Sequence, residues 1–512
     1  MRFCLYFSLA SFLIIGACQD AASDAMPALS ERKQIDNYSF PDSVKLAIKH
    51  HCGSCHQAPS PELLDKNTWK SYVLPRMGYL LGRYIDISRD SLIETQAVAS
   101  VFPEETMISE SVWNSIQDFY LAAAPDQLAG GLAYDSLELT TLFNAKFPNY
   151  FLSPPSSTLV QFGKHGEIYV GDANSNSLFL FDAQLQLLNK ATVREGAVHL
   201  DEEEGDIRLT VMGSFSPTDQ PYGFILGLPT DGKRAPYLVI DSLQRPVHSS
   251  YADLDGDGST DIITSEFGKW TGSLSWWKNL GNQQYKRELL RGKAGATKTI
   301  PYDLDQDGDL DVLALMAQGD EGIFWYENVG EGIFKEQLLI QFPPSFGSSF
   351  FNLIDWDKDG LMDILYTAGD NADYPPIEKP YHGVYIFQNK GGLRFEEVFF
   401  QPMPGAYKAI VEDFDQDQDW DIAAISFFPD FVQKPEAAFL YLENKGGEFE
   451  RKTIPQSTAG RWISMDAGDP DGDGDLDLIV GSLAFEVVPP SPLLRQWVDN
   501  GIPFILLENT TK

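Results

Sequence analysis

The feature that most constrains the fold of this chain is a short loop rich in aspartate and glycine, which recurs five times. The loops begin at residues 253, 303, 355, 413 and 469, so they are 50, 52, 58 and 56 residues apart. An apolar, strand-like run follows each loop, and the next run ends in an asparagine turn. A period near fifty residues with several short strands per unit is typical of β-propeller blades. The sequence therefore predicts an all-β propeller.

The number of blades follows from the length of the β-rich region, which we expect over residues 149–512. Its first part, 150–245, lacks the aspartate loop but has strand-like runs and room for two blades of the same period. Five blades with loops and two without them predict a seven-bladed propeller. The last unit stops at residues 506–509, so we expect a segment on the N-terminal side to supply the closing strand.

Alternating aspartates in each loop indicate a site for a hard cation. Ca²⁺ prefers six to eight oxygen ligands, and loop positions 1, 3, 5 and 9 offer carboxylates while position 7 offers a backbone carbonyl. Glycine at position 6 permits a turn with positive φ; Gln418 replaces it in the fourth loop, where we expect strain and weaker binding. The sequence predicts about five Ca²⁺ ions that stiffen the blades. The expected ligands are Asp253, Asp255, Asp257, Asp261, Asp303, Asp305, Asp307, Asp311, Asp355, Asp357, Asp359, Asp363, Asp413, Asp415, Asp417, Asp421, Asp469, Asp471, Asp473 and Asp477.

These units resemble the FG-GAP or VCBS repeats of integrin α-subunit propellers. The resemblance is strong over about residues 245–512 and weak over 150–245. The loops differ from an EF-hand, because they lie between strands and lack a glutamate at position 12. The resemblance implies a calcium-binding propeller.

The first residues predict export. Met1 and Arg2 precede an apolar run over residues 3–15, which is too short to span a bilayer as a permanent helix. With Cys18, this start resembles a bacterial lipoprotein signal peptide over residues 1–17, which implies lipidation of Cys18; an ordinary secretory signal is the alternative. We expect an exported protein on a lipid anchor, in the periplasm or at the outer membrane or cell surface, with residues 18–37 as a tether.

Residues 38–125 predict a small all-α domain, followed by a linker over 126–148. Residues 41–43 form a helix start, and Ser109 is the expected N-cap of a last helix that ends before Pro125. Cys4 is lost with the signal peptide and Cys18 takes lipid, so two of the four cysteines remain and no structural disulfide is expected.

The two remaining cysteines lie in the segment Cys52-Gly53-Ser54-Cys55-His56. This spacing adds two thioethers to a haem and places the next imidazole on the iron. A zinc ribbon would need more cysteines, and a thioredoxin-like pair would need a βαβ context that the helical flanks do not supply. The segment predicts one covalent haem c bound through Cys52, Cys55 and His56.

The second axial ligand is expected in the same domain. Residues 69–78 resemble the Trp-to-Met stretch of class I cytochromes c, a resemblance that covers about residues 38–125. It implies that Met77 binds the iron, although Met77 follows His56 by only 21 residues. Met107, just before the last helix, is the alternative. A thioether ligand favours ferrous iron and raises the reduction potential.

The formal net charge of −36 argues against a nucleic-acid partner, because phosphate binding needs a basic face. No catalytic motif stands out, and His165, His199, His248 and His382 are scattered along the chain. We therefore expect an electron-transfer protein that meets a redox partner protein, with the propeller as a docking scaffold. The alternatives are a haem-linked oxidoreductase with a substrate pocket on the propeller, and an adhesion module that binds a glycan or protein.

Overall fold

The computed structural model describes residues 34–128, 137–194, 196–203, 205–372, 377–484 and 491–511. The expected signal peptide, the lipidation site Cys18 and most of the tether lie outside these residues. Within the described residues, no helix has the length and apolar character needed to cross a membrane.

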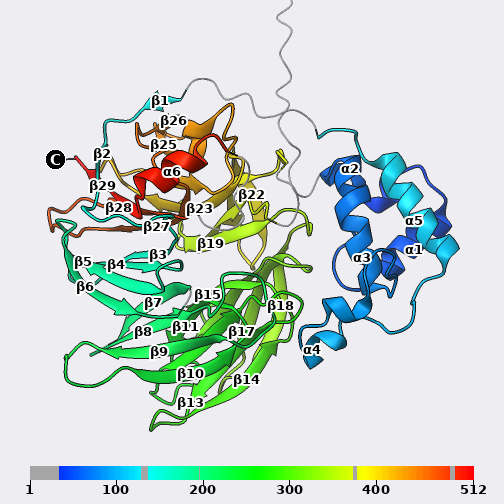
Figure 1. Ribbon diagram of the computed structural model, residues 1–512, viewed down its shortest axis with the longest axis horizontal. Helices are drawn as coiled ribbons and strands as arrows, with labels where there is room; N and C mark the ends of the chain where they lie inside the picture. The colour runs from blue at the N-terminus through cyan, green and yellow to red at the C-terminus, as the bar shows by residue number, and fades with distance from the viewer. Residues whose placement is uncertain are drawn as a thin grey trace, which may run out of the picture. The chain divides into compact units, whose positions relative to one another are not determined.

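The N-terminal part of the described chain is helical (Figure 1). Its α-helices are α1 (Asp42–His51), α2 (Lys66–Thr68), α3 (Leu74–Leu80), α4 (Gln96–Ala99) and α5 (Glu110–Ala123). A π-helical turn, η4 (Trp69–Val73), joins α2 to α3, and the 3₁₀ turns are η2 (Ile35–Asn37), η3 (Pro61–Leu63) and η5 (Arg89–Leu92). We call residues 34–128 the helical region.

The two long helices, α1 and α5, form where the sequence predicts them. The Ser109 hydroxyl accepts a hydrogen bond from the backbone N–H of Val112 at 3.4 Å, as expected for an N-cap. The two helices pack against each other and share an apolar core, which includes Ile48, Trp69, Leu74, Trp113, Ile116, Phe119 and Tyr120. The core therefore joins both ends of the helical region.

Seven β-sheets follow, and each is one blade of a propeller. Blade 1 contains β3 (Ser157–Phe162), β4 (Ile168–Asp172), β5 (Ser177–Phe181) and β6 (Leu187–Thr192). Blade 2 contains β7 (Ala197–Glu203), β8 (Asp206–Val211), β9 (Gly223–Pro229) and β10 (Tyr237–Leu243). Blade 3 contains β11 (Pro246–Ala252), β12 (Asp261–Glu266), β13 (Ser273–Asn279) and β14 (Tyr285–Arg291). The two blades expected upstream of the first aspartate loop are thus present.

Blade 4 contains β15 (Ala296–Tyr302), β16 (Asp311–Met316), β17 (Gly322–Asn328) and β18 (Phe334–Gln341). Blade 5 contains β19 (Ser348–Ile354), β20 (Asp363–Ala368), β21 (Gly383–Asn389) and β22 (Phe395–Pro402). Blade 6 contains β23 (Ala406–Glu412), β24 (Asp421–Ser426), β25 (Phe439–Asn444), β26 (Phe449–Thr453) and β1 (Glu138–Leu139). Blade 7 contains β27 (Trp462–Gly468), β28 (Asp477–Ser482), β29 (Phe504–Asn509) and β2 (Phe143–Lys146). The 3₁₀ turn η6 (Pro435–Ala438) and helix α6 (Leu494–Asn500) lie in connections of blades 6 and 7.

The ring is closed by a strand from before the first blade. Strand β2 pairs antiparallel with β29, with Phe143 opposite Asn509 and Lys146 opposite Leu506. This agrees with the expected borrowed strand. The segment 126–148, however, is more than a linker, because it supplies β1 and β2. The reason is packing: Phe143 is only 6% exposed and contacts the aromatic rings of Phe414 and Tyr441.

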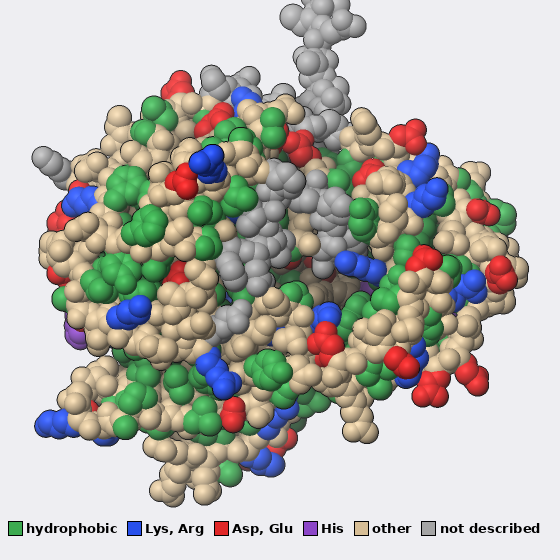
Figure 2. All heavy atoms as spheres, in the orientation of Figure 1, with side chains coloured by type: hydrophobic (Ala, Val, Ile, Leu, Met, Phe, Trp, Pro, Cys, Tyr) green, Lys and Arg blue, Asp and Glu red, His purple; other side chains and the backbone are tan. Residues whose placement is uncertain are grey.

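The innermost strand of each blade contacts the innermost strands of its neighbours, so β3, β7, β11, β15, β19, β23 and β27 surround the propeller axis. The second strands of blades 3 to 7 are buried along their whole length, since both faces pack against adjacent blades. On the face drawn in Figure 2, acidic and basic side chains are interspersed. The excess negative charge is therefore not gathered into one patch on that face.

Candidate functional site

The cysteine motif forms the turn that ends α1. Cys52 is the C-cap, and its N–H donates to the Ile48 carbonyl at 2.8 Å. A Cβ atom on Gly53 would lie 2.4 Å from the carbonyl oxygen of Lys49, so this position accepts only glycine without a backbone shift. The turn brings both cysteines and His56 to the same end of the helix.

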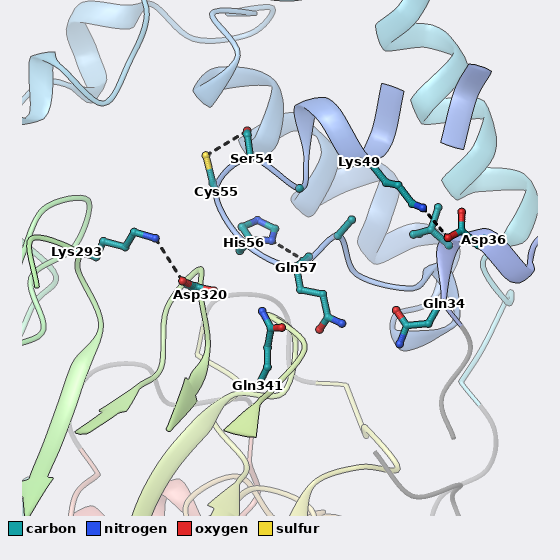
Figure 3. A pocket seen from close by; sticks show the side chains of 13 residues that line it. Gln34, Asp36, Lys49, Ser54, Cys55, His56, Gln57, Lys293, Asp320 and Gln341 are labelled. Carbon is teal, nitrogen blue, oxygen red and sulfur yellow. Dashed lines mark hydrogen bonds and ion pairs between the residues drawn. The ribbon is translucent and has the colours of Figure 1, made fainter. Parts of the chain in front are cut away.

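The side chains of this turn are arranged for ligation. The Nδ1 atom of His56 lies 2.8 Å from the carbonyl oxygen of Gln57, a contact that orients the ring and leaves Nε2 as the nitrogen that could bind a metal. Cys52 and Cys55 are both free thiols. Burial raises the pKa of the Cys52 thiol to about 12, and the neighbouring Cys55 adds to the shift. Figure 3 shows the His56 ring on this turn, across from Asp320 and Gln341 of blade 4.

Two adjoining cavities meet at His56. The larger, about 560 Å³, is bordered by the motif turn and by Lys293, Asp320 and Gln341 of the propeller. The smaller, about 60 Å³, is mainly apolar and is lined by both Cys52 and Met77. Its other lining residues are His56, Pro59, Leu64, Trp69, Val73, Leu74, Trp113, Tyr120, Pro344 and Ser345. The cysteine motif and Met77, which are separate in sequence, therefore border one apolar space.

The two candidate methionines differ in position. Met77 lies on α3 and packs against the apolar core, whereas the Met107 side chain is 63% exposed and does not line either cavity. Gly78, the next residue on α3, lies against α5: a Cβ atom at this position would be 3.4 Å from the Trp113 ring, an ordinary van der Waals contact. The geometry favours Met77 over Met107 as the residue beside His56.

The residues present fit a haem. The Cys52 thiol, the His56 imidazole and the Met77 thioether border a space walled by aromatic rings, and the second free thiol, Cys55, borders the adjoining larger cavity. The polar ends of two of these rings are satisfied by the backbone: Trp69 donates to the Pro61 carbonyl at 2.8 Å and Tyr120 to the Pro59 carbonyl at 3.0 Å. Their apolar faces are free to exclude water from the space.

The aspartate loops join the first and second strands of blades 3 to 7. In every loop, carboxylate oxygens of three aspartates lie within 4.8 Å of one another, as a divalent cation requires. The five groups are Asp253, Asp255 and Asp261; Asp303, Asp305 and Asp311; Asp355, Asp357 and Asp359; Asp413, Asp415 and Asp417; and Asp469, Asp471 and Asp473. All five groups consist of positions 1 and 3 together with position 5 or position 9, and the group of blade 7 is made of exposed side chains.

The aspartates at position 9 also have a structural role. Asp363 is fully buried; it accepts the N–H of Trp356 at 2.9 Å and that of Asn389, which ends the third strand, at 2.7 Å. The position-9 aspartates of the other four blades accept the N–H of the equivalent asparagine at 2.7–2.8 Å. This repeated contact ties the loop to the third strand of each blade.

The fourth loop has the strained turn that the sequence predicts. Gln418 adopts φ +81°, a conformation held by glycine at the same position of the other loops, and its N–H donates to Asp413 at 2.9 Å. The loops also differ in the charges nearby. Lys278 forms an ion pair with Asp255 in the first loop, and Lys445 lies 3.6 Å from Asp415 in the fourth.

The structure brings together histidines that are far apart in sequence. The rings of His199 and His248 lie 4.1 Å apart on β7 and β11, next to the propeller axis. Lys298 and Lys408 lie on innermost strands of the same ring. His199 and His248 are strand residues that are distant in sequence, and the closed ring of blades makes them neighbours. For three of these four basic residues the sequence carries a signal, a position five residues before an aspartate loop: 248 precedes 253, 298 precedes 303 and 408 precedes 413, whereas His199 precedes no such loop.

Comparison with known proteins supports the repeat assignment. The family described as "FG-GAP-like repeat" matches residues 253–314, 303–366 and 413–480. A comparison with curated proteins gave no significant match. Together with the seven sheets, the repeat match confirms a seven-bladed propeller with FG-GAP repeats.

Several solved structures have a similar chain trace. Virginiamycin B lyase from Staphylococcus aureus is 10% identical, with 72% of this chain and 100% of that chain covered and a TM-score of 0.46. Sqt1 from Saccharomyces cerevisiae is 8% identical, with 71% and 98% covered and a TM-score of 0.44. The N-terminal domain of Nup159 is 11% identical, with 72% and 97% covered and a TM-score of 0.43.

Proposed function

We propose that this chain is an extracytoplasmic electron-transfer protein that carries one covalent haem c in its helical region. The observation that carries the proposal is the meeting of Cys52, His56 and Met77 at one apolar cavity, with Cys55 as the second free thiol of the turn. Electron carriers need a cofactor held rigidly in an apolar site, and these residues offer its attachment points and ligands.

Each residue has a distinct part in this proposal. Cys52 and Cys55 would hold the haem through two thioethers, and His56 and Met77 would bind its iron. The haem would supply one-electron redox chemistry. The hydrogen bond from His56 to Gln57 keeps the imidazole oriented, and the thioether of Met77 would favour the ferrous state. Trp69, Trp113 and Tyr120 exclude water from the site, which also raises the potential.

The propeller would serve as a calcium-stabilised docking scaffold for a redox partner protein. The supporting observation is the aspartate cluster in each of the five loops, where like charges are crowded within 4.8 Å. Bound Ca²⁺ would remove that repulsion and stiffen the hairpins. The sequence start, with Cys18 as the lipidation site, supports a protein anchored outside the cytoplasm.

Substitution of the two methionines tests the proposed ligand. In haem-loaded protein, Met77→Ala should lower the midpoint potential and change the spin state of the ferric iron, because a thioether ligand is lost. Met107→Ala is the matched control and should leave both unchanged, since its side chain is exposed. Equal behaviour of the two variants would rule out Met77 as the ligand.

A further inference from the structure

One equivalent position on each innermost strand forms a ring around the propeller axis. In all seven blades, this is the residue directly after the register shift between the first and second strands. The ring consists of Leu159, His199, His248, Lys298, Phe350, Lys408 and Ser464. Four of its seven members carry basic nitrogen groups, in a chain whose net charge is −36. We call these four residues, His199, His248, Lys298 and Lys408, the axial basic cluster.

The cluster is well defined geometrically. The amino groups of Lys298 and Lys408 lie 4.1 Å and 5.1 Å from the centre of the same ring, that of Phe350. The Lys298 amino group also lies 3.4 Å from the Asn352 side-chain oxygen. The two imidazoles are 4.1 Å apart. One aromatic ring thus holds both ammonium groups toward the axis.

The positive groups have few partners. Among the described residues, no carboxylate lies within ion-pair distance, 4.0 Å, of Lys298 or Lys408. The negative charge of Asp466 acts on both lysines. Asp466 lies on β27, two residues after Ser464, and one of its oxygens accepts the N–H of Phe162 at 2.9 Å. The buried Nδ1 atom of His199 has no hydrogen-bond partner. Within the described parts of the chain, the two ammonium groups therefore lack a carboxylate at ion-pair distance, and the His199 ring has an unpartnered nitrogen.

The pKa values of these groups agree with the shortage of negatively charged partners. Burial, together with the nearby charge of Lys408, lowers the pKa of Lys298 to about 7. Burial likewise lowers the pKa of Lys408 and, to about 3, that of His199. Cations crowded in a desolvated ring are destabilised unless a negative charge joins them. The same crowding makes a metal cation an unsuitable occupant.

We propose that the axial basic cluster binds a small oxyanion, the carboxylate or phosphate-type group of a ligand that enters along the propeller axis. The two ammonium groups would donate to its oxygens. The Nδ1 atom of His248 lies 3.5 Å from the N–H of Thr299 and acts as an acceptor there, which leaves Nε2–H of that ring as a further donor. The site goes beyond the proposed electron transfer and does not depend on haem.

Melting of the full-length protein in sulfate or succinate tests the site, with chloride keeping the ionic strength constant. Sulfate stands for phosphate-type groups and succinate for carboxylates. At least one of the two anions should raise the melting temperature of the wild type, and the rise should level off as the anion concentration increases. In Lys298→Met/Lys408→Met the saturable rise should vanish, while the melting temperature without anion should increase because two unpaired cations are removed. The control Lys233→Met/Lys335→Met removes two exposed lysines and should behave as the wild type.

A second measurement uses only the wild-type protein. Lys298 and Lys408 should react with a methylating reagent, and their reactivity should fall at least several-fold when the effective anion is present. Peptide mass spectrometry measures the methylation of each lysine. The reactivity of the exposed Lys233 should not change. Protection by sulfate alone, succinate alone or both identifies the class of oxyanion. Equal melting shifts in the wild type and the cluster variant, or no protection by either anion, would overturn the proposal.

Discussion

The propeller and the helical region are stabilised in different ways. In five blades the same buried aspartate accepts the N–H of the asparagine that ends the third strand, at 2.7–2.8 Å. The helical region has no such repeated contact, and its core borders an apolar cavity with Cys52 and Met77 on its wall. The difference teaches that the propeller is specified blade by blade from its own chain, while the core of the helical region leaves an apolar cavity, which the proposed haem would fill.

The largest expected effect is a loss of stability in the propeller alone. Phe143→Ala removes the buried ring of the closing strand from its contacts with Phe414 and Tyr441, and should lower the free energy of unfolding by about 3–5 kcal/mol. Phe147→Ala is the control, because Phe147 is 45% exposed, and should cost less than about 0.5 kcal/mol. Urea unfolding followed by circular dichroism measures both. Similar losses in the two variants would contradict the closing role of β2.

The second effect tests whether the position-9 aspartates stabilise their blades without a bound metal ion. In excess chelator, Asp363→Ala should cost about 1–3 kcal/mol, because the buried N–H groups of Trp356 and Asn389 lose their acceptor. Asp359→Ala, at an exposed position of the same loop, should cost less under these conditions. If the two variants differ only when Ca²⁺ is present, position 9 acts through the metal and not through these hydrogen bonds.

The third effect concerns Glu321, a buried acid that directly precedes β17 of blade 4. Burial raises the pKa of Glu321 to about 8, although Ser348 hydrogen-bonds to it. The folded protein therefore binds more protons than the unfolded chain between the ordinary value of 4.5 and about 8, so this group should lower stability as pH rises through that window. Glu321→Gln should weaken the fall in melting temperature between pH 5.5 and 8.5. An unchanged pH profile would show that Glu321 is not buried as a neutral acid.

The smallest effect compares two loops of the propeller. Lys278 neutralises Asp255 in the first loop, whereas Glu508 adds negative charge beside Asp471 in the fifth. Lys278→Met should therefore raise the Ca²⁺ affinity of the first loop severalfold, an effect of about 1 kcal/mol. Calcium titration by calorimetry measures it, with Lys286→Met, an exposed lysine on β14, as the control. No change in any binding phase would argue against Ca²⁺ at this loop.

The sequence was sufficient for features that are local or repeated. Each aspartate loop marks a blade because its ligands, turn glycine and following strand are contiguous, and Ser109 marks a helix start for the same reason. The axial basic cluster could not be read in this way, because each blade contributes one residue and only the closed ring brings them together. A closing strand was predicted, but its position at β2 was not, since four residues give too short a pattern to distinguish from a linker.

The central claim is that Cys52, Cys55 and His56 hold a covalent haem, and intact mass spectrometry with visible absorbance tests it most directly. Full-length protein from cells able to attach haem should retain the added mass of one haem after denaturation. After reduction, it should show the absorbance spectrum of ferrous haem. Cys52→Ser/Cys55→Ser should abolish both signals and destabilise the helical region while the propeller melts as before. Colourless wild-type protein, with two titratable thiols at Cys52 and Cys55, would contradict the account.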